Sequence, residues 1–228
     1  MAAASATSDY PRGNGTGGGG WTGADRALLL GLVAFAALRT ASLVFSPLEL
    51  GVDEAQYWLW STGFDFGYYT KPPLTSWIIG LSHSLFGHHE WAVRLPAPWL
   101  HLATSLVLWR AADWLAGPAA GRIAAIIWMT LPSIALGSFV ISTDTPLLLC
   151  WSAGVLALVG VLTGRLRERR GMLLAGGAFG AAMLAKYAAI YGLAGLALFV
   201  LATSVLSRDT ERQKVIGWRG LGLFALGM

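Results

Sequence analysis

Apolar residues run along this chain in blocks, and polar residues gather between the blocks. A helix needs about 20 largely apolar residues to cross a bilayer, because its backbone must satisfy its own hydrogen bonds in hydrocarbon. The blocks that approach this length are residues 26–45, 92–112, 120–141, 146–163 and 172–206. Lys186 interrupts the last block, which predicts two helices, the first of about 14 residues, with a turn at the lysine at one membrane surface.

Lys and Arg residues are distributed unevenly between the connections that join these blocks. Twelve of the 16 fall on one side, including the run "RLRERR", whereas Lys71, Arg94 and Lys186 fall on the other and Arg39 lies inside the first block. Connections rich in Lys and Arg stay in the cytoplasm. The N-terminus is therefore predicted to be cytoplasmic, in a multi-pass protein of the cytoplasmic membrane, and residues 46–91 to form a long extracytoplasmic loop.

The two ends of the chain differ from its middle. Residues 1–23 are rich in Ala, Gly, Ser and Thr, and are predicted to be a disordered cytoplasmic tail because they bury too little apolar surface to become ordered. The chain ends in "GLGLFALGM", an apolar run that begins a further span, so we expect residues 24–228 to be the N-terminal, incomplete part of a transmembrane domain. The predicted class is all-α: a polytopic membrane helical bundle whose extracytoplasmic first loop carries interfacial helices.

The composition supports a membrane protein and argues against other classes. Hydrophobic residues make up 55% of the chain, charged residues 12%, and there are 11 Trp. The net charge of +4 suggests no nucleic acid partner, because no basic stripe with interleaved aromatics is found. Cys150 is the single cysteine, which excludes an intrachain disulfide and a thiolate zinc site. His83, His88 and His89 show no helical ligand spacing, so neither a metal site nor an obligatory cofactor is predicted.

Two adjacent acids stand at the start of "VDEAQYWLWSTG", a segment predicted to form a short helix at the membrane interface. Asp53 is placed to cap its N-terminus and Glu54 to be a favourable first-turn charge, which would give both a structural duty. Alternatively, one of the two is a general base at the membrane surface. These residues alone leave both interpretations open, as well as the choice between the two acids.

A lysine followed by two prolines occurs further along the same loop, in "YYTKPPL". Proline disfavours helical geometry at the residue before it, so Lys71 is predicted to present its ammonium group from a stiff, non-helical backbone. A cation fixed in this way at the outer leaflet suits a phosphate group. The alternative is a lysine that merely extends its charge to water at a helix start.

Three more charged residues are candidates for a site on the extracytoplasmic side. In "STDTPLLLC" we expect Thr145 to cap a helix that begins at Pro146, which leaves Asp144 outside the helix without a structural duty. Arg39 lies in the outer part of the first block, and Lys186 interrupts the last one. Ionisable residues at these depths are functional candidates, and both cations could pair with the acids or bind an anion.

The ordered set of motifs resembles the GT-C superfamily of polytopic glycosyltransferases, which includes protein O-mannosyltransferases and the lipid A aminoarabinose and galacturonosyltransferases. The matching stretches, in the order of the superfamily, are "DEAQYWLW", "FDFGYYTKPPL", "RLPAP", "STDTPLLL" and "LAKYAAIY". The resemblance covers residues 26 to about 206. It implies transfer of a sugar from a polyprenyl-phosphate donor to a lipid, glycan or protein hydroxyl on the extracytoplasmic face, without a nucleotide-binding domain.

Site residues follow from the resemblance, position by position. Asp53, with Glu54 beside it, would take the proton of the acceptor, and Asp144 would position a substrate. Lys71 would bind the donor phosphate, with Arg39 and Lys186 as further phosphate-binding candidates. The main alternative is a transporter or flippase for a lipid-linked or anionic substrate. It is disfavoured because the two halves of the chain show no repeat and the charges gather at one membrane surface.

Overall fold

The computed structural model describes residues 21–206 and 218–228, and every regular element within these ranges is a helix. The predicted all-α class is confirmed for this part of the chain. The helices are α1 (Gly23–Val44), α2 (Val52–Ser61), α3 (Leu74–Phe86), α4 (Glu90–Arg94), α5 (Pro96–Ala116), α6 (Pro118–Thr130), α7 (Pro132–Gly137), α8 (Asp144–Leu162), α9 (Glu168–Ala185), a 3₁₀ turn (Tyr187–Ala189), α10 (Ile190–Leu206) and α11 (Trp218–Gly227).

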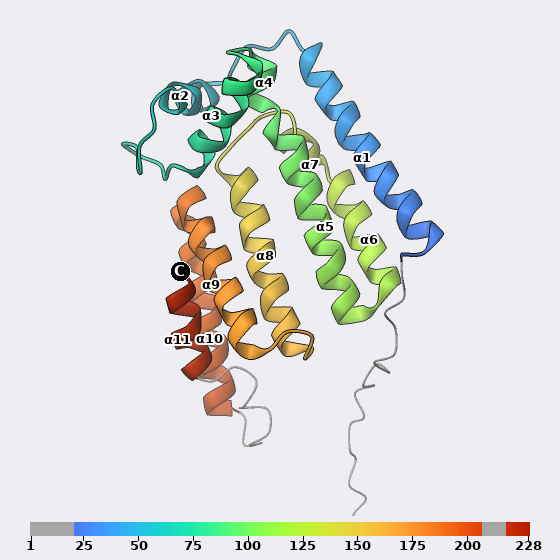
Figure 1. Ribbon diagram of the computed structural model, residues 1–228, viewed down its shortest axis with the longest axis vertical. Helices are drawn as coiled ribbons and strands as arrows, with labels where there is room; N and C mark the ends of the chain where they lie inside the picture. Colours follow the sequence, from blue (N-terminus) through green and yellow to red (C-terminus); the bar gives the residue numbers. More distant parts are fainter. Residues whose placement is uncertain (1–20, 207–217) are drawn as a thin grey trace, which may run out of the picture.

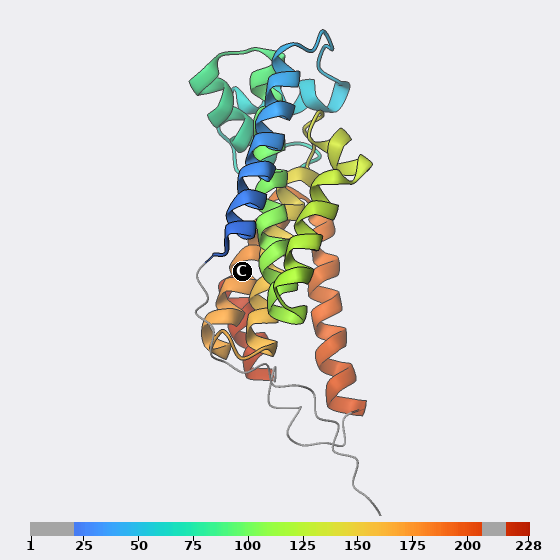
Figure 2. The ribbon, with the colours of Figure 1, turned by 90° about the vertical axis from the view of Figure 1, so that its right-hand side faces the viewer.

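The long helices lie roughly along one axis, and the short helices α2, α3 and α4 form a cap at one end (Figures 1 and 2). The connection from α1 to α2 enters the cap, and the connection from α7 to α8 passes beneath it (Figure 1). Helix α8 packs extensively on α9 and α5, α5 packs on α6, and α11 packs on α9. The predicted long first loop carries helices, as expected, and together with α4 these helices form an ordered cap.

Prolines divide two of the predicted spans. The block 120–141 was expected to be a single helix, and this prediction is wrong: Leu131 leaves helical geometry with ψ 132° and a separate helix starts at Pro132. The physical reason is that proline disfavours helical geometry at the residue before it. The block 92–112 is also divided, between α4, which ends at Arg94, and α5, which begins at Pro96, although Leu95 between them keeps helical dihedral angles. Its second part is the long helix.

The predicted interruption at Lys186 is confirmed. Lys186 has extended geometry, with φ −158° and ψ 132°, and separates α9 from the 3₁₀ turn and α10. The preceding helix is longer than expected, with 18 residues, because it begins at Glu168 within the basic loop instead of at residue 172. Lys186 therefore has an irregular backbone at the cap end of the bundle.

The first helix starts at the edge of the predicted tail. The side chain of Thr22 accepts from the backbone of Asp25, and the Asp25 carboxylate accepts from the backbone of Thr22, which forms a capping box. Gly23 is therefore helical, whereas the tail was predicted to extend through residue 23. Residues 1–20 lie outside the described residues. An ion pair of 3.2 Å between Asp25 and Arg122 joins the start of α1 to α6.

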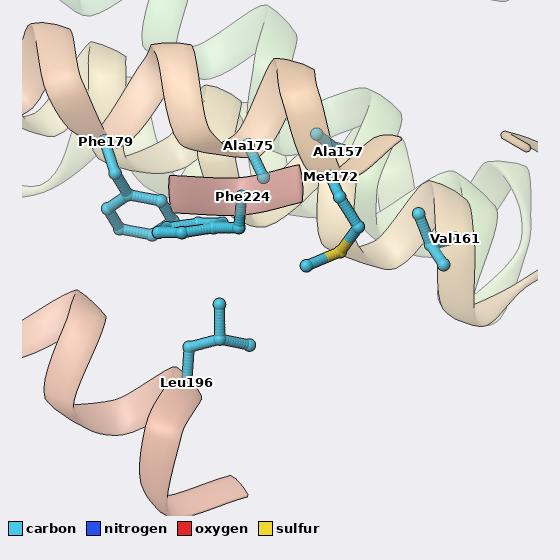
Figure 3. Packing of buried hydrophobic residues seen from close by; sticks show 7 residues of the cluster. All are labelled: Ala157, Val161, Met172, Ala175, Phe179, Leu196 and Phe224. Atoms are coloured by element: carbon cyan, nitrogen blue, oxygen red, sulfur yellow. The ribbon is translucent and has the colours of Figure 1, made fainter. Parts of the chain in front are cut away.

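Small and large apolar side chains alternate in the cores that join the long helices. Figure 3 shows the core around Phe179, in which side chains from α8, α9, α10 and α11 meet. Its buried members are Ala157, Val161, Met172, Ala175, Phe179, Leu196 and Phe224. Glycines allow close approach here, since a Cβ at Gly154 would lie 2.6 Å from the ring of Phe179. Among the described helices, α1 and α8 are both long and apolar enough to cross a membrane by length and composition.

Candidate functional site

The first turn of α2 separates the two adjacent acids into different surroundings. Neighbouring residues of a helix point about 100° apart, so both cannot face the same way. Glu54 is buried, with 1% of its surface exposed, and Asp53 is exposed. The expectation that Asp53 caps the helix is wrong, because the N-cap is Gly51, whose N–H donates to the Glu54 carboxylate at 3.0 Å. The sequence was ambiguous since either acid fits the first turn.

Glu54 forms a buried ion pair with Arg94 at the end of α4. Arg94 Nε donates to Glu54 Oε1 at 2.9 Å and Arg94 Nη2 donates to Glu54 Oε2 at 2.7 Å, in a bidentate arrangement. Arg94 also donates to the carbonyl oxygens of Leu48 and Glu49. The hydrogen bonds to Glu54 raise the pKa of Arg94, although burial acts in the opposite direction. Arg94 therefore remains charged, and the pair fastens α2 and the preceding loop to α4.

The Glu54 carboxylate also reaches the segment before α8. The backbone N–H of Ile141 donates to Glu54 Oε1 at 3.1 Å. Together with Gly51 and Arg94, this gives each carboxylate oxygen two donors. A carboxylate occupied in this way is a structural anchor between three segments of the chain.

Asp53 and Lys71 differ from the other charged candidates because their charged groups have no bonding partner among the described residues. Within residues 21–206 and 218–228, neither side chain takes part in a hydrogen bond or ion pair. Lys71 is half-buried, and only its backbone carbonyl is engaged, by the N–H of Tyr68 at 3.2 Å. The two buried prolines after Lys71 lead directly into α3. Both groups are thus available to a ligand.

Asp144 and Lys186 form an ion pair at the same end of the bundle. Lys186 Nζ donates to Asp144 Oδ1 at 2.7 Å, and both side chains remain partly exposed. The prediction that Asp144 lies outside its helix is wrong: α8 begins at Asp144, and Thr143, not Thr145, is the N-cap residue. A carboxylate in the first turn is favourable there because of the helix dipole. The pairing of Lys186 with an acid, expected as one alternative, is confirmed.

The start of α3 lies against the outer ends of α8 and α9. Leu74 packs on a buried cluster to which α8 contributes Leu147 and α9 contributes Ala185. Lys71 is three residues before Leu74, Asp144 is three residues before Leu147, and Lys186 directly follows Ala185. This packing places Lys71, in the loop before α3, and Lys186, at the interruption after α9, near Asp144. The four candidates Asp53, Lys71, Asp144 and Lys186 thus lie at the cap end.

Tyr57 lies close enough to the two exposed acids for their charges to affect its pKa, and sequence reasoning did not single it out. It lies one helical turn after Asp53, is 2% exposed and packs with Ile141, three residues before Asp144. Burial, together with the negative charges of Asp53 and Asp144, raises the pKa of the Tyr57 phenol, whereas a hydrogen bond with the Thr143 side chain acts in the opposite direction. The segment "DEAQYWLW" was predicted only as part of a short interfacial helix, which did not distinguish Tyr57 from the other aromatic residues in it.

Arg39 is engaged elsewhere in the bundle. Its guanidinium donates to Ser138 Oγ at 2.9 Å and to the carbonyl of Met129 at 2.7 Å, and it lies over the ring of Phe35. These contacts join α1 to the end of α6 and to the residue after α7. The pairing of Arg39 with an acid is not found among the described residues. Its side chain instead anchors the segment that leads into α8.

His83, in the last turn of α3, and His88, in the loop before α4, make ring contacts. The rings of His83 and His88 lie 4.4 Å apart, and Trp58 Nε1 donates to His88 Nδ1 at 3.1 Å. In the part of the chain that the structure describes, no group of three or more His, Cys, Asp or Glu side chains is placed to hold a metal ion. These histidines instead pack α2 against α3 and the loop before α4.

An apolar groove of about 330 Å³ runs between α8 and the facing sides of α9 and α10. Its lining includes Trp151, Leu158, Phe179, Tyr191 and Leu196. Trp151 is two helical turns beyond Asp144 and Tyr191 is five residues beyond Lys186, so the groove extends from near the ion pair into the bundle. Its lining suits hydrocarbon.

Comparison with known proteins identifies proteins that are similar to this chain in fold and in sequence. The structure is similar to the crystal structure of ArnT from Cupriavidus metallidurans in the apo state, with a TM-score of 0.71 and 21% sequence identity over 90% of this chain and 41% of that chain. The sequence of this chain is also 37% identical to that of the lipid A galacturonosyltransferase RgtD of Rhizobium johnstonii. The aligned 191 residues cover 81% of this chain. The chain spans about two fifths of the length of that relative, 39%.

The fold and the ordered motifs define a polytopic helical membrane protein of the GT-C superfamily, as the resemblance implied. Residues 70–227 match the family model described as dolichyl-phosphate-mannose-protein mannosyltransferase, and the chain belongs to this family. The match begins one residue before Lys71 and includes Asp144 and Lys186.

Proposed function

We propose that this chain carries the acceptor-activating and phosphate-binding groups of a membrane glycosyltransferase that uses a polyprenyl-phosphate sugar donor. The observation that carries this proposal is the contrast at the cap. One carboxylate, Asp53, and one ammonium group, Lys71, have no side-chain partner among the described residues, while Glu54 and Arg94 are fully engaged in a buried pair. Glycosyl transfer to a hydroxyl needs a base that is free to accept a proton and a cation that is free to bind the phosphate.

The reaction assigns a task to each of these groups. Asp53 accepts the proton of the acceptor hydroxyl as its oxygen forms a bond to the anomeric carbon of the sugar. The bond between that carbon and the phosphate oxygen breaks, and its electron pair leaves with the phosphate. Lys71 stabilises the negative charge that develops on this phosphate. Asp144 and Lys186 position the substrates, since their partly exposed ion pair can exchange partners with a phosphate or a sugar hydroxyl.

The other charged candidates from the sequence have positioning tasks in this proposal. Glu54 is not the base, because its carboxylate oxygens accept hydrogen bonds from Gly51, Arg94 and Ile141. Its buried pair holds the turn that presents Asp53. Arg39 does not bind the donor phosphate but fixes Ser138. The apolar groove beside α8 supports a lipid-linked donor. No bound metal is invoked in these steps.

The choice of substrates to assay first rests only on sequence similarity to a named relative. The Rhizobium johnstonii relative is named as a lipid A galacturonosyltransferase. We therefore take a polyprenyl-phosphate galacturonate donor and a lipid A acceptor as the first pair to assay. Other lipid, glycan or protein hydroxyls are the next acceptors to be tried. A transporter of the same lipids would export labelled substrate across vesicles without forming a new glycosidic bond, which distinguishes that alternative.

Lys71→Ala is expected to lower kcat/KM for the donor about 100-fold to 1,000-fold, because a developing phosphate charge loses its fixed cation. The assay uses membranes containing the full-length protein and a radiolabelled polyprenyl-phosphate sugar. Arg110→Ala, which removes an exposed cation of α5, is the control and should leave the rate unchanged. Unchanged transfer by Lys71→Ala would contradict the assignment of Lys71 to the donor phosphate.

We further propose that the cap lies on the extracytoplasmic side of the cytoplasmic membrane, with the N-terminus in the cytoplasm. The uneven distribution of Lys and Arg supports this orientation. A reporter enzyme that is active only outside the cytoplasm should be active when fused after Gly87 and inactive when fused after Arg167. The opposite pattern would reverse the orientation and place the acids in the cytoplasm.

A further inference from the structure

The loop between α2 and α3, residues 62–70 and here termed the aromatic loop, exposes a group of aromatic rings at the side of the cap. Phe64 is 73% exposed, Phe66 is 79% exposed and Tyr69 is 97% exposed. A contiguous exposed patch of large apolar side chains marks a surface that contacts a partner, a ligand or a membrane. The tasks assigned above to the charged residues of the cap leave these rings unexplained.

Two rings of the aromatic loop form an ordered cluster with Trp77 of α3. The ring of Phe64 stacks on that of Trp77, with centroids 5.2 Å apart and an interplanar angle of 14°. The ring of Phe66 meets both of them edge-on, at 5.3 Å from Phe64 and 5.8 Å from Trp77. The exposed rings are therefore held in place before any partner binds, which lowers the entropy that binding costs.

Hydrogen bonds within the cap occupy polar backbone groups of the aromatic loop. Trp77 Nε1 donates to the carbonyl of Asp65 at 2.8 Å. The hydroxyl of Tyr68 donates to the carbonyl of Gly63 at 2.9 Å, and the N–H of Phe66 donates to the Asp65 carboxylate at 2.7 Å. An irregular segment next to lipid is costly unless its polar groups have partners of this kind. The loop therefore combines exposed apolar rings with backbone groups that are already hydrogen-bonded.

The aromatic loop lies at the level where the long helices reach the cap. It descends from α2 to the level of the first turn of α8 (Figure 1). Leu74, just after the loop, packs on the buried cluster that includes Leu147 of α8 and Ala185 of α9. Helix α8 is long and apolar enough to cross a bilayer, and it begins at Asp144. The boundary between hydrocarbon and headgroups is therefore near the loop, and aromatic side chains are favoured at such a boundary.

Further exposed aromatic side chains lie on the neighbouring helical break. Tyr187 and Tyr191 follow Lys186 closely, and both are exposed. Ala189, between them, belongs to the cluster on which Leu74 packs. The aromatic surface of the loop therefore continues onto the bundle at the same level. A bilayer boundary contacts such a surface along its whole length, whereas a small ligand covers only one part of it.

We propose that the aromatic loop is a membrane anchor, in which Phe64, Phe66 and Tyr69 insert into the headgroup region of the leaflet at the cap end of the bundle. Asp65, the only charged residue of the loop, keeps the insertion at the interface and out of the hydrocarbon core. The anchoring goes beyond the proposed function and does not depend on it. Lys71 directly follows the loop, so under the proposed function the anchor holds its ammonium group at the depth of lipid phosphates.

The test measures what surrounds residue 69 in the full-length protein, reconstituted in vesicles of phosphatidylethanolamine and phosphatidylglycerol. Cys150 and every other cysteine are replaced by Ser, and Tyr69→Cys carries an environment-sensitive fluorophore, which leaves the ring cluster around Trp77 in place. Glu49→Cys, labelled in the same way, is the control, because Glu49 is exposed in the connection from α1 to α2, at the end of the cap away from the long helices (Figure 1). Lipids with a spin label in the upper acyl chain should quench the fluorophore at residue 69 at least about threefold more than at residue 49, and iodide in the water should do the reverse.

Substitution of the rings tests whether they cause the insertion. In the chain labelled at residue 69, Phe64→Ser combined with Phe66→Ser should reduce quenching by the spin-labelled lipid at least about twofold and increase quenching by iodide. Leu48→Ser, which makes a similar change at an exposed apolar residue outside the loop, should leave both unchanged.

Three results would overturn the anchor. Equal quenching by iodide at both labelled positions would show that the loop faces water, and shielding of residue 69 from both quenchers would show that protein covers it. Unchanged lipid quenching after both Phe substitutions would show that the rings do not hold the loop at the membrane. Lipid quenching in a protein that transfers no sugar would reject the proposed function and retain the anchor.

Discussion

Arg94→Ala is expected to lower the free energy of unfolding by about 3–5 kcal/mol, the largest effect on stability that we predict for the cap. The substitution leaves the Glu54 carboxylate buried without its cation, while Gly51 and Ile141 still donate to it. It also leaves the carbonyl groups of Leu48 and Glu49 without the Arg94 donors. Thermal and denaturant unfolding of the detergent-solubilised full-length protein, followed by tryptophan fluorescence, measures the change.

Two further variants define what this result means. Arg110→Ala removes an arginine whose side chain is 51% exposed and whose contact with Asp113 spans 3.6 Å, so a change of at most about 0.5 kcal/mol is expected. Glu54→Gln combined with Arg94→Met should be less destabilised than Arg94→Ala, because no charge remains buried without a partner. A loss below about 1 kcal/mol for Arg94→Ala would show that the pair is not the anchor of the cap.

Asp53→Asn is expected to lower kcat about 100-fold to 10,000-fold, the range that a general base contributes. The change keeps the size of the side chain and removes only its ability to take a proton. Because Asp53 is exposed and no described side chain contacts its carboxylate, the free energy of unfolding should remain within about 0.5 kcal/mol of the parent. Initial rates of sugar transfer in membranes, together with the unfolding midpoint, measure both quantities.

Comparison with two neighbouring carboxylates separates catalysis from folding. Glu49→Gln removes another exposed acid of the same loop and should leave kcat unchanged. Glu54→Gln should lower stability, because Arg94 then lies buried opposite a neutral group. If Asp53→Asn transfers sugar at the parental rate while Glu54→Gln folds normally and is inactive, Glu54 is the base and our assignment is reversed.

Local patterns identified the elements that depend on nearby residues. The break at Lys186 was predicted because a lysine interrupts an apolar block, and the structure confirms it. The rigid presentation of Lys71, expected from the two prolines after it, stays a prediction. The capping roles of Asp53 and Thr145 were predicted wrongly, because Gly51 and Thr143 provide the N-caps. More than one nearby residue suited each cap, and only the path of the preceding chain selects between them.

Contacts between distant residues decided the tasks of the charged side chains. Arg94 was known only as part of "RLPAP", and its pairing with Glu54 spans 40 residues. Arg39 lies 99 residues before Ser138, to which it donates. Tyr57 looked like one aromatic among several until packing placed it beside Ile141 and Thr143. No local pattern carries information on such pairings.

The sequence by itself determined an all-helical membrane protein whose charged candidate residues lie at one end. The reason is that the length of the apolar blocks and the distribution of Lys and Arg are local properties, and these properties govern how a chain inserts into a bilayer. It also provided two adjacent acids and a rigid lysine in "DEAQYWLWSTGFDFGYYTKPP". Only the tertiary structure decided which acid stays open. Adjacent helical positions face different surroundings, and the side that meets Arg94 is buried and paired. Glu54 is therefore the anchor, and Asp53 remains exposed.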